Sequence, residues 1–167
     1  MLKGILIKMK KNNLKNDNEF LEIIDDLIKN ETVCEMKKYM QHYDISTFQH
    51  CQNVAYISYK ICKKLKLDYV SMARGAMLHD LFLYDWHEKR PHTKFSDLHA
   101  FSHPKIALKN AKKITKLNKK EEDIILKHMW PVTPALPRYK ESFIITLVDK
   151  YSTIAEGINY YKRKLCQ

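Results

Sequence analysis

The chain has 167 residues, which suits one domain with its own hydrophobic core and excludes a string of several domains. It contains only three glycines and five prolines, while Leu, Ile and Lys are abundant, so helices joined by short connections are expected rather than a sheet of many strands. The net charge of +11 favours anionic ligands, either phosphates or nucleic acid, although a lysine-rich composition bias gives the same excess.

Cysteine usage gives an expectation about the compartment. The four cysteines show no C-x-x-C spacing and are too sparse for a disulfide scaffold; they are Cys34, Cys51, Cys62 and Cys166. We therefore expect reduced thiols and a cytoplasmic location.

The opening segment is expected to stand apart from the folded domain. Lys3 and Lys8 interrupt its short apolar cluster and no small-residue cleavage site follows, so we expect neither a signal peptide nor a membrane span there. The polar run that follows predicts a frayed N-terminal extension over residues 1–18. The domain proper is then expected over residues 19–167.

Two short helices are predicted at the start of the domain. Apolar residues recur at helical spacing from Phe20 to Ile28, and a second set continues from Thr32 to Met40. Both helices are expected to serve packing.

The third predicted helix carries the first candidate site residue. Ser46 or Thr47 can cap it, and His50 shares a stripe with apolar residues at steps of four, three and four, namely Val54, Ile57 and Ile61. His50 is therefore expected to face inward.

The fourth predicted helix, which Asp68 can cap, leads into the pair His79-Asp80. Adjacent helical residues point about 100° apart, so both members of the pair can reach one site only if the helix ends or bends beside them. Gly75 is expected to allow close approach of a neighbouring helix.

Residues 85–100 show no period and mix cations, histidines and aromatic residues. We expect a long functional loop here, placed to form a lid or a substrate wall. The run Ser102-His103-Pro104 then predicts the start of a helix, with Pro104 in its first turn.

Two further helices complete the chain. Asn118 can cap a helix over residues 119–129, on which Ile124 and His128 share a face. A proline-rich connection ends it, and a final helix is expected over residues 141–160. On that last helix four residues line up at steps of three and four: Ile145, Asp149, Ser152 and Glu156.

The order H, HD, H, H, D on successive helices resembles the HD-domain superfamily of metal-dependent phosphohydrolases. The phrases that carry the resemblance lie between Phe48 and Glu156; they are Gln49-His50-Cys51-Gln52-Asn53-Val54-Ala55, Leu78-His79-Asp80-Leu81, Ser102-His103-Pro104, Leu126-Lys127-His128 and Leu147-Val148-Asp149. The resemblance implies an all-α fold, a compact single-domain bundle of roughly six to eight helices.

The two extra histidines resemble superfamily members that carry two metals. Such members include symmetrical diadenosine tetraphosphate hydrolases and cyclic-dinucleotide phosphodiesterases. The Gly-Tyr-Pro signature of the second group is missing from the sequence, which argues against a cyclic-dinucleotide substrate.

The resemblance also implies the ligand sets. The first metal site is implied to consist of His50, His79, Asp80 and Asp149, and the second of Asp80, His103 and His128, with His79 and Asp80 at the catalytic centre. A mononuclear site would leave His103 and His128 as pocket residues, and His99 is a competing ligand. Imidazole and carboxylate donors suit Fe, Mn, Co or Zn, which would generate a hydroxide nucleophile for attack on a phosphate.

Candidates for substrate contacts lie on the connecting segments and on the last helix; they are Asp85, Trp86, Arg90, His99, Trp130, Arg138, Lys140 and Lys150. Arg138 is the preferred phosphate clamp, because a guanidinium binds phosphate oxygens in a fork, although a solvated surface cation explains it equally. Trp86 and Trp130 can stack on a base or form an apolar rim. Asp85 can orient a ligand, shuttle a proton or cap the loop.

The sequence therefore predicts a metal-dependent phosphohydrolase that acts on a nucleotide or another small phosphate ester or anhydride. The alternatives are a nucleotide-binding regulatory module without turnover and a basic nucleic-acid-binding protein. No sequence-specific nucleic-acid motif supports the last of these. A small anionic substrate and no membrane partner are expected, while the substrate, the metal and the oligomeric state are open.

Overall fold

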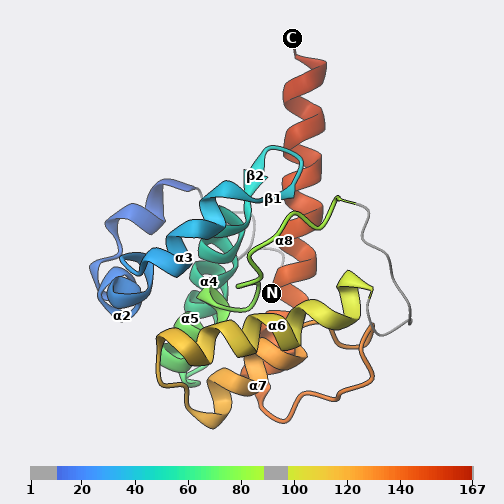
Figure 1. Ribbon diagram of the computed structural model, residues 1–167. Helices are drawn as coiled ribbons and strands as arrows, with labels where there is room; N and C mark the ends of the chain where they lie inside the picture. The colour runs from blue at the N-terminus through green and yellow to red at the C-terminus, as the bar shows by residue number, and fades with distance from the viewer. Residues whose placement is uncertain (1–10, 89–97, 167) are drawn as a thin grey trace.

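The computed structural model describes residues 11–88 and 98–166 as a helical bundle with one small two-stranded sheet (Figure 1). Seven α-helices, α2 to α8, and two 3-10 helices, η1 and η2, lie within the described residues. The expected all-α fold class is confirmed. Within these same ranges, no helix is both long and apolar enough to cross a membrane.

The first described elements are η1 (Lys11–Asn16) and α2 (Asn18–Ile28). Leu14 packs against the hydrophobic core, and the Asp17 carboxylate accepts a hydrogen bond from the Phe20 N–H at 3.2 Å, which caps α2. The end of the segment expected to fray, residues 1–18, is thus in contact with the domain, while residues 1–10 lie outside the described part.

The helix expected through Met40 is wrong only in its last two residues. The chain forms α3 (Glu31–Glu35) and η2 (Met36–Lys38), then a hairpin of β1 (Met40–His42) and β2 (Ile45–Ser46) paired antiparallel. Met36, Tyr39 and Met40 have helical spacing, but Tyr39 is extended and its carbonyl accepts a hydrogen bond from the Thr47 N–H at 2.9 Å. This pairing across the hairpin outweighs the weak helical pattern.

Helices α4 (Thr47–Lys64) and α5 (Tyr69–Met77) pack against each other at the centre of the bundle. The Ser46 hydroxyl caps α4 by accepting from the Gln49 N–H at 3.3 Å, and the Asp68 carboxylate caps α5 by accepting from the Ser71 N–H at 3.0 Å. The expected caps are therefore confirmed, with Ser46 as the choice at α4.

Helix α6 (His99–Ile114) begins three residues before the expected start, so Pro104 lies inside the helix and not in its first turn. The Ser102 hydroxyl donates back to the Leu98 carbonyl at 3.1 Å instead of capping. The proline ring removes one intrahelical donor, while the rings of His99 and His103 stack at 4.5 Å across the same turn. The expected loop over residues 85–100 is described only in part, since residues 89–97 lie outside the described ranges.

Helix α7 (Lys119–Lys127) begins with a capping box, as the Asn118 side chain accepts from the Glu121 N–H while the Glu121 side chain accepts from the Asn118 N–H. It ends two residues before the expected limit of 129. A Cβ atom placed on Gly75 would lie 3.0 Å from the Ile124 side chain. The expected close approach is thus confirmed, between α5 and α7.

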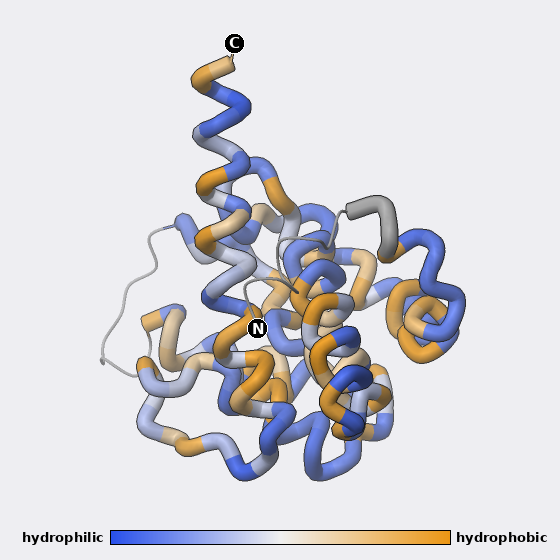
Figure 2. Tube along the Cα trace, turned by 180° about the vertical axis from the view of Figure 1, so that it is seen from behind, coloured by the Kyte–Doolittle hydropathy of each residue, from blue (hydrophilic) through white to orange (hydrophobic). Residues whose placement is uncertain are grey.

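The last helix, α8 (Lys140–Leu165), runs five residues further than expected. The added turn contains the basic side chains of Lys162 to Lys164, which stabilise the C-terminus of a helix. Because these side chains are charged, they do not indicate in the sequence which face of the helix is buried. Helix α8 packs against α4 and α7 along its first part, and its last turns project beyond the bundle (Figures 1 and 2).

One hydrophobic core joins these helices. Its largest fully buried side chains come mainly from α2, α4, α5 and α7 and from the segment after α5; they are Tyr59, Phe20, Phe82, Ile24, Leu27, Met36, Met72, Met77, Leu78, Leu81, Ile124 and Ile125. All four cysteines are free, in line with the expected reduced thiols.

Candidate functional site

The pair His79-Asp80 lies in the turn that follows α5. The helix ends at Met77, so the two adjacent side chains leave helical geometry and both can face one site, as expected. Both side chains are buried. The Nδ1 of His79 lies 2.7 Å from the Ala76 carbonyl, to which it donates, and this bond leaves Nε2 as the nitrogen that faces inward.

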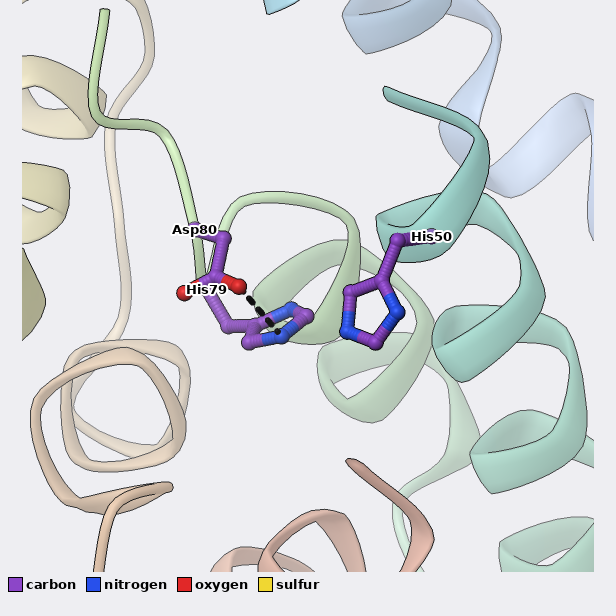
Figure 3. A group of neighbouring side chains, drawn as sticks. All are labelled: His50, His79 and Asp80. Carbon is purple, nitrogen blue, oxygen red and sulfur yellow. Dashed lines mark ion pairs between the residues drawn. The ribbon is translucent and has the colours of Figure 1, made fainter. Parts of the chain in front are cut away.

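Two further side chains converge on this pair from α4 and α8. The Nε2 of His50 lies 3.0 Å from Oδ1 of Asp149, and the Nε2 of His79 lies 3.7 Å from the same oxygen. Oδ2 of Asp80 lies 3.4 Å from the Nε2 of His79. Figure 3 shows the rings of His50 and His79 pointing toward one another from their separate elements, with the Asp80 carboxylate beside them.

The other oxygen of Asp80 faces a second pair of histidines. Oδ1 lies 3.2 Å from the Nε2 of His103, on α6, and 3.4 Å from the Nε2 of His128, which follows α7. The Nδ1 atoms of these rings donate to the carbonyls of His99 and Ile125, at 2.7 and 2.8 Å. Asp80 therefore stands between two sets of donors.

The donor atoms fit a divalent metal. A neutral imidazole that donates from Nδ1 has only a lone pair on Nε2, yet the Nε2 atoms of His103 and His128 face each other at 2.8 Å. Within the described residues, the buried Nε2 of His79 and Oδ1 of Asp80 have no hydrogen-bond partner. Such uncompensated acceptors are costly in a protein interior unless a cation satisfies them.

Three overlapping groups of side chains have ligand atoms close enough to share an ion, within 4.8 Å of one another. They are His50 with His79 and Asp80, then His79 with His128 and Asp149, and finally Asp80 with His103 and His128. Nitrogen and oxygen donors of this kind suit Mn, Fe, Co or Zn. Asp80 belongs to groups on both sides of the site, a position that suits a bridging carboxylate.

The electrostatics of the site keep its carboxylates ionised. Burial alone would raise the pKa of Asp80 and Asp149, but the surrounding histidines hold both pKa values below the usual range. Burial also opposes the charged form of His50, yet the two carboxylates that contact it, Asp149 and Glu156, raise its pKa to about 10. In contrast, burial lowers the pKa of His128.

Two residues that support the site were not identified from the sequence. Glu156 lies on the Asp149 face of α8 and accepts from the Nδ1 of His50 at 3.0 Å, so its helical alignment with Asp149 was the signal available. Gln41, on β1, donates from Nε2 to Oδ2 of Asp80 at 2.7 Å, and its Oε1 accepts from the Thr47 hydroxyl at 3.2 Å. No pattern pointed to Gln41, because the hairpin that carries it was not expected.

A pocket of about 480 Å³ opens over Asp80, Asp149 and the second pair of histidines, His103 and His128. Its residues come from β1, the segment after α5, α6, the segment after α7 and α8; they are Gln41, His42, Asp80, Trp86, His99, Ala100, His103, His128, Met129, Val132, Asp149, Lys150, Thr153 and Ile154. The Trp86 ring stacks on the His99 ring at 5.1 Å, and its Nε1 donates to the Gln41 carbonyl. The pocket therefore has polar ligands at its floor and aromatic and aliphatic walls.

Three of the expected substrate contacts, Trp86, His99 and Lys150, line this pocket. The Nζ of Lys150 is directed at backbone carbonyls, including those of Trp130 at 3.0 Å and Thr146 at 3.3 Å, so it joins α8 to the end of α7.

The remaining expected contacts lie elsewhere. Among the described residues, Asp85, Trp130, Arg138 and Lys140 are outside the pocket lining. Asp85 accepts from the His87 N–H at 2.9 Å, and the Trp130 ring contacts Phe143 at 5.6 Å. Arg138 is exposed, and its backbone N–H donates to Asp123. Arg90 lies outside the described residues.

Comparison with protein-family models identifies a known domain in the chain. A family model described as HD domain matches residues 47–154, about two thirds of the chain. This range runs from the first residue of α4 to the middle of α8 and includes all six candidate metal ligands. Neither the curated proteins nor the solved structures gave a match.

Proposed function

The chain belongs to the HD-domain family of metal-dependent phosphohydrolases, and from this premise we propose that it hydrolyses a nucleotide or another small phosphate ester or anhydride. The observation that carries the proposal is the group of buried atoms around Asp80: the Nε2 atoms of His103 and His128 lie 2.8 Å apart, and among the described residues the Nε2 of His79 and Oδ1 of Asp80 have no hydrogen-bond partner. A divalent cation bound among these atoms would satisfy them all, which explains why they are buried together.

We assign one ion to His50, His79, Asp80 and Asp149 and a second to Asp80, His103 and His128. When bound, divalent ions of this kind lower the pKa of a coordinated water and offset charge on phosphate oxygens. Only two of the six ligands are carboxylates, so the loaded site carries net positive charge and favours an anionic substrate. Fe, Mn, Co and Zn all remain candidates.

The chain's own groups hold these ligands in place. Backbone carbonyls of Ala76, His99 and Ile125 fix the tautomer and orientation of three histidines through their Nδ1–H groups. Glu156 does the same for His50 with a carboxylate, and Gln41 restrains one oxygen of Asp80. The ligands are therefore restrained before any ion arrives, which favours catalysis by reducing reorganisation.

The pocket supports a substrate about the size of a nucleotide. Its volume of about 480 Å³ lies within the range of small-molecule sites. Trp86, which stacks on both His87 and His99, gives the pocket an aromatic wall, and Val132 and Ile154 give apolar contacts. A phosphate group placed at the ligand floor would then leave the organic part of the substrate between these walls.

The proposal is tested by metal analysis of the purified protein, followed by a phosphate-release screen with Mn, Fe, Co and Zn. The screen covers mononucleotides, dinucleoside polyphosphates and simple phosphate esters. Asp80→Asn should lower activity at least about 100-fold, since it removes a ligand shared by both ions. The matched control is Asp25→Asn, an exposed carboxylate that pairs only with Lys29, and it should leave activity unchanged.

Two outcomes would count against the proposal. Nucleotide binding without turnover in any metal would favour a regulatory module instead. Equal activity of the wild type and Asp80→Asn would place the chemistry elsewhere. The cytoplasmic location stays a prediction from the reduced cysteines.

A further inference from the structure

Helix α8 has an exposed apolar face that the bundle does not cover. We name this face the α8 stripe; its members are Leu147, Tyr151, Ile154, Ile158, Tyr161 and Leu165. Tyr151 is half-buried, and the other five side chains are between 51% and 86% exposed. Figure 2 shows apolar residues alternating with hydrophilic ones along the projecting end of this helix.

The spacing of the α8 stripe is that of a helix-pairing seam. Its members follow one another at steps of four, three, four, three and four residues, which keeps them on one face of the helix. Sustained alternation of this kind is the repeat through which two helices pack side by side. Scattered exposed apolar residues would not hold such a period over 19 positions.

The stripe also reads the same in both directions. From Leu147 to Leu165 the residue types run Leu, Tyr, Ile, Ile, Tyr, Leu, and the steps between them are symmetric about position 156. In an interface with two-fold symmetry, residue i of one copy contacts residue j of the other and the reverse contact also forms. An antiparallel pair of α8 helices would therefore match leucine with leucine, tyrosine with tyrosine and isoleucine with isoleucine.

We propose that two copies of this chain associate through the α8 stripe, with the helices antiparallel about a two-fold axis that passes between Ile154 and Ile158. Leu147 of one copy then packs on Leu165 of the other, Tyr151 on Tyr161, and Ile154 on Ile158. The occupant of the exposed face is a second copy of the chain.

Charge selects the antiparallel direction. Lys162 and Lys164 lie in the last turn of α8, so a parallel pair would bring the two basic ends together. In the antiparallel pair these ends lie about 20 Å apart, well beyond the screening distance at physiological salt. The antiparallel arrangement thus satisfies the apolar pattern and keeps the two basic helix ends apart.

The available surface suits an interface of ordinary size. The stripe offers on the order of 500 Å² of side-chain surface, against about 800 Å² per partner in a standard interface. Further exposed apolar residues lie near both ends of the stripe, with Phe143 one turn before Leu147 and Tyr43 in contact with Tyr161. These residues add contact area at both ends of the stripe.

Pairing would also place the second copy beside the substrate pocket. Ile154 belongs to the stripe and also lines the pocket, and Lys150 is a second residue of α8 that lines the pocket. The end of the second copy's α8 would then lie alongside Lys150 and form an outer wall of the pocket mouth. Each copy would contribute such a wall to the other.

The mass of the full chain in solution is the first test. Light scattering after size exclusion should give twice the 19.9 kDa chain mass at micromolar concentration. Ile158→Asp should raise the dissociation constant at least about 100-fold, because the substitution enters the interface twice. Asn159→Asp is the matched control, since Asn159 is an exposed neighbour off the stripe, and it should leave the dimer intact.

Cross-linking tests the direction and register. In a Cys34→Ser/Cys166→Ser background, Leu147→Cys and Leu165→Cys are prepared as separate proteins. Oxidation should give a disulfide-linked dimer only when the two are mixed, because position 147 faces position 165 of the other copy. Cross-linking of either variant alone would indicate parallel helices and overturn the proposal.

A monomer at every concentration tested would also overturn the proposal and would assign the stripe to another partner. The circular dichroism of Ile158→Asp should match the wild type, since Ile158 is exposed in the single chain, whereas the rise of melting temperature with protein concentration should be seen only in the wild type. Neither mass nor cross-linking depends on catalysis, so the outcome is independent of the proposed hydrolase activity.

Discussion

The two sides of the candidate metal centre are held in different ways. On the His50 side, side chains of other elements support the ligands: Glu156 accepts from His50, and Gln41 restrains Asp80. On the other side, the Nδ1 atoms of His103 and His128 donate to backbone carbonyls within their own segments. The first side is therefore a cross-linked network, and the second depends on where α6 and the end of α7 lie.

This contrast predicts how substitutions on each side should change the metal content of the protein. Loss of a ligand on the His50 side should lower the metal content most, because it disturbs several elements at once. Those on the His103 side should release one ion and spare the other. The predictions below begin with the largest expected effect.

His79→Gln should have the largest effect on metal content. His79 belongs to two of the three ligand groups and packs within 4.8 Å of the His128 ring, so its loss affects both sides. We expect metal content below one ion per chain and activity reduced at least about 100-fold. Elemental analysis and phosphate release measure the two quantities, and a variant that keeps two ions would contradict the ligand assignment.

His103→Gln should produce a protein with one ion. The first side keeps all four of its ligands, while the second is left with Asp80 and His128. Activity should fall about 10- to 100-fold, with metal content near one ion per chain. Metal titration by calorimetry would show the loss of one binding event. Loss of both events would mean that the two sides do not act separately.

Glu156→Gln should weaken only the first side, by about 10-fold in metal affinity. The amide oxygen can still accept from His50, but the negative charge behind the imidazole is lost. Competition with a chelator measures the affinity. Glu22→Gln, at an exposed position on α2 away from the site, is a suitable control. An unchanged affinity would reduce Glu156 to a packing role.

Asn118→Ala should have the smallest effect on the site itself. It removes the cap of α7, at a cost of about 1 kcal/mol in the free energy of unfolding. Because His128 follows α7, occupancy of the second side should fall slightly while the first side is unaffected. Urea unfolding measures the stability, and a change of more than about 3 kcal/mol would point to a further role of Asn118.

Most of the fold and the ligand set could be predicted because both follow from helical periodicity. His50 and Asp149 coincide with buried positions of amphipathic helices, and the end of α5 beside His79 was required by geometry. The hairpin of β1 and β2 could not be predicted in the same way, since it is short and Met40 imitates a helical position. Gln41 was missed together with the element that carries it.

Substrate contacts were harder to predict than metal ligands. Arg138 has suitable chemistry, but the fold directs its backbone toward Asp123 and leaves it outside the pocket lining found among the described residues. Position in a connection between helices says little about where a long side chain lies. Trp86 and His99 do line the pocket, because the segment after α5 and the start of α6 stack on each other.

The close crossing of α5 and α7 at Gly75 sets the width of the centre. Gly75 lies four residues before His79, and Ile124, against which it packs, lies four residues before His128. The lack of a side chain at Gly75 thus allows the short distance between α5 and α7, one helical turn before a ligand on each helix. A single added methyl group at position 75 would press the helices apart and widen the distance between His79 and His128. The geometry of the metal centre therefore depends on a residue that is not one of its ligands.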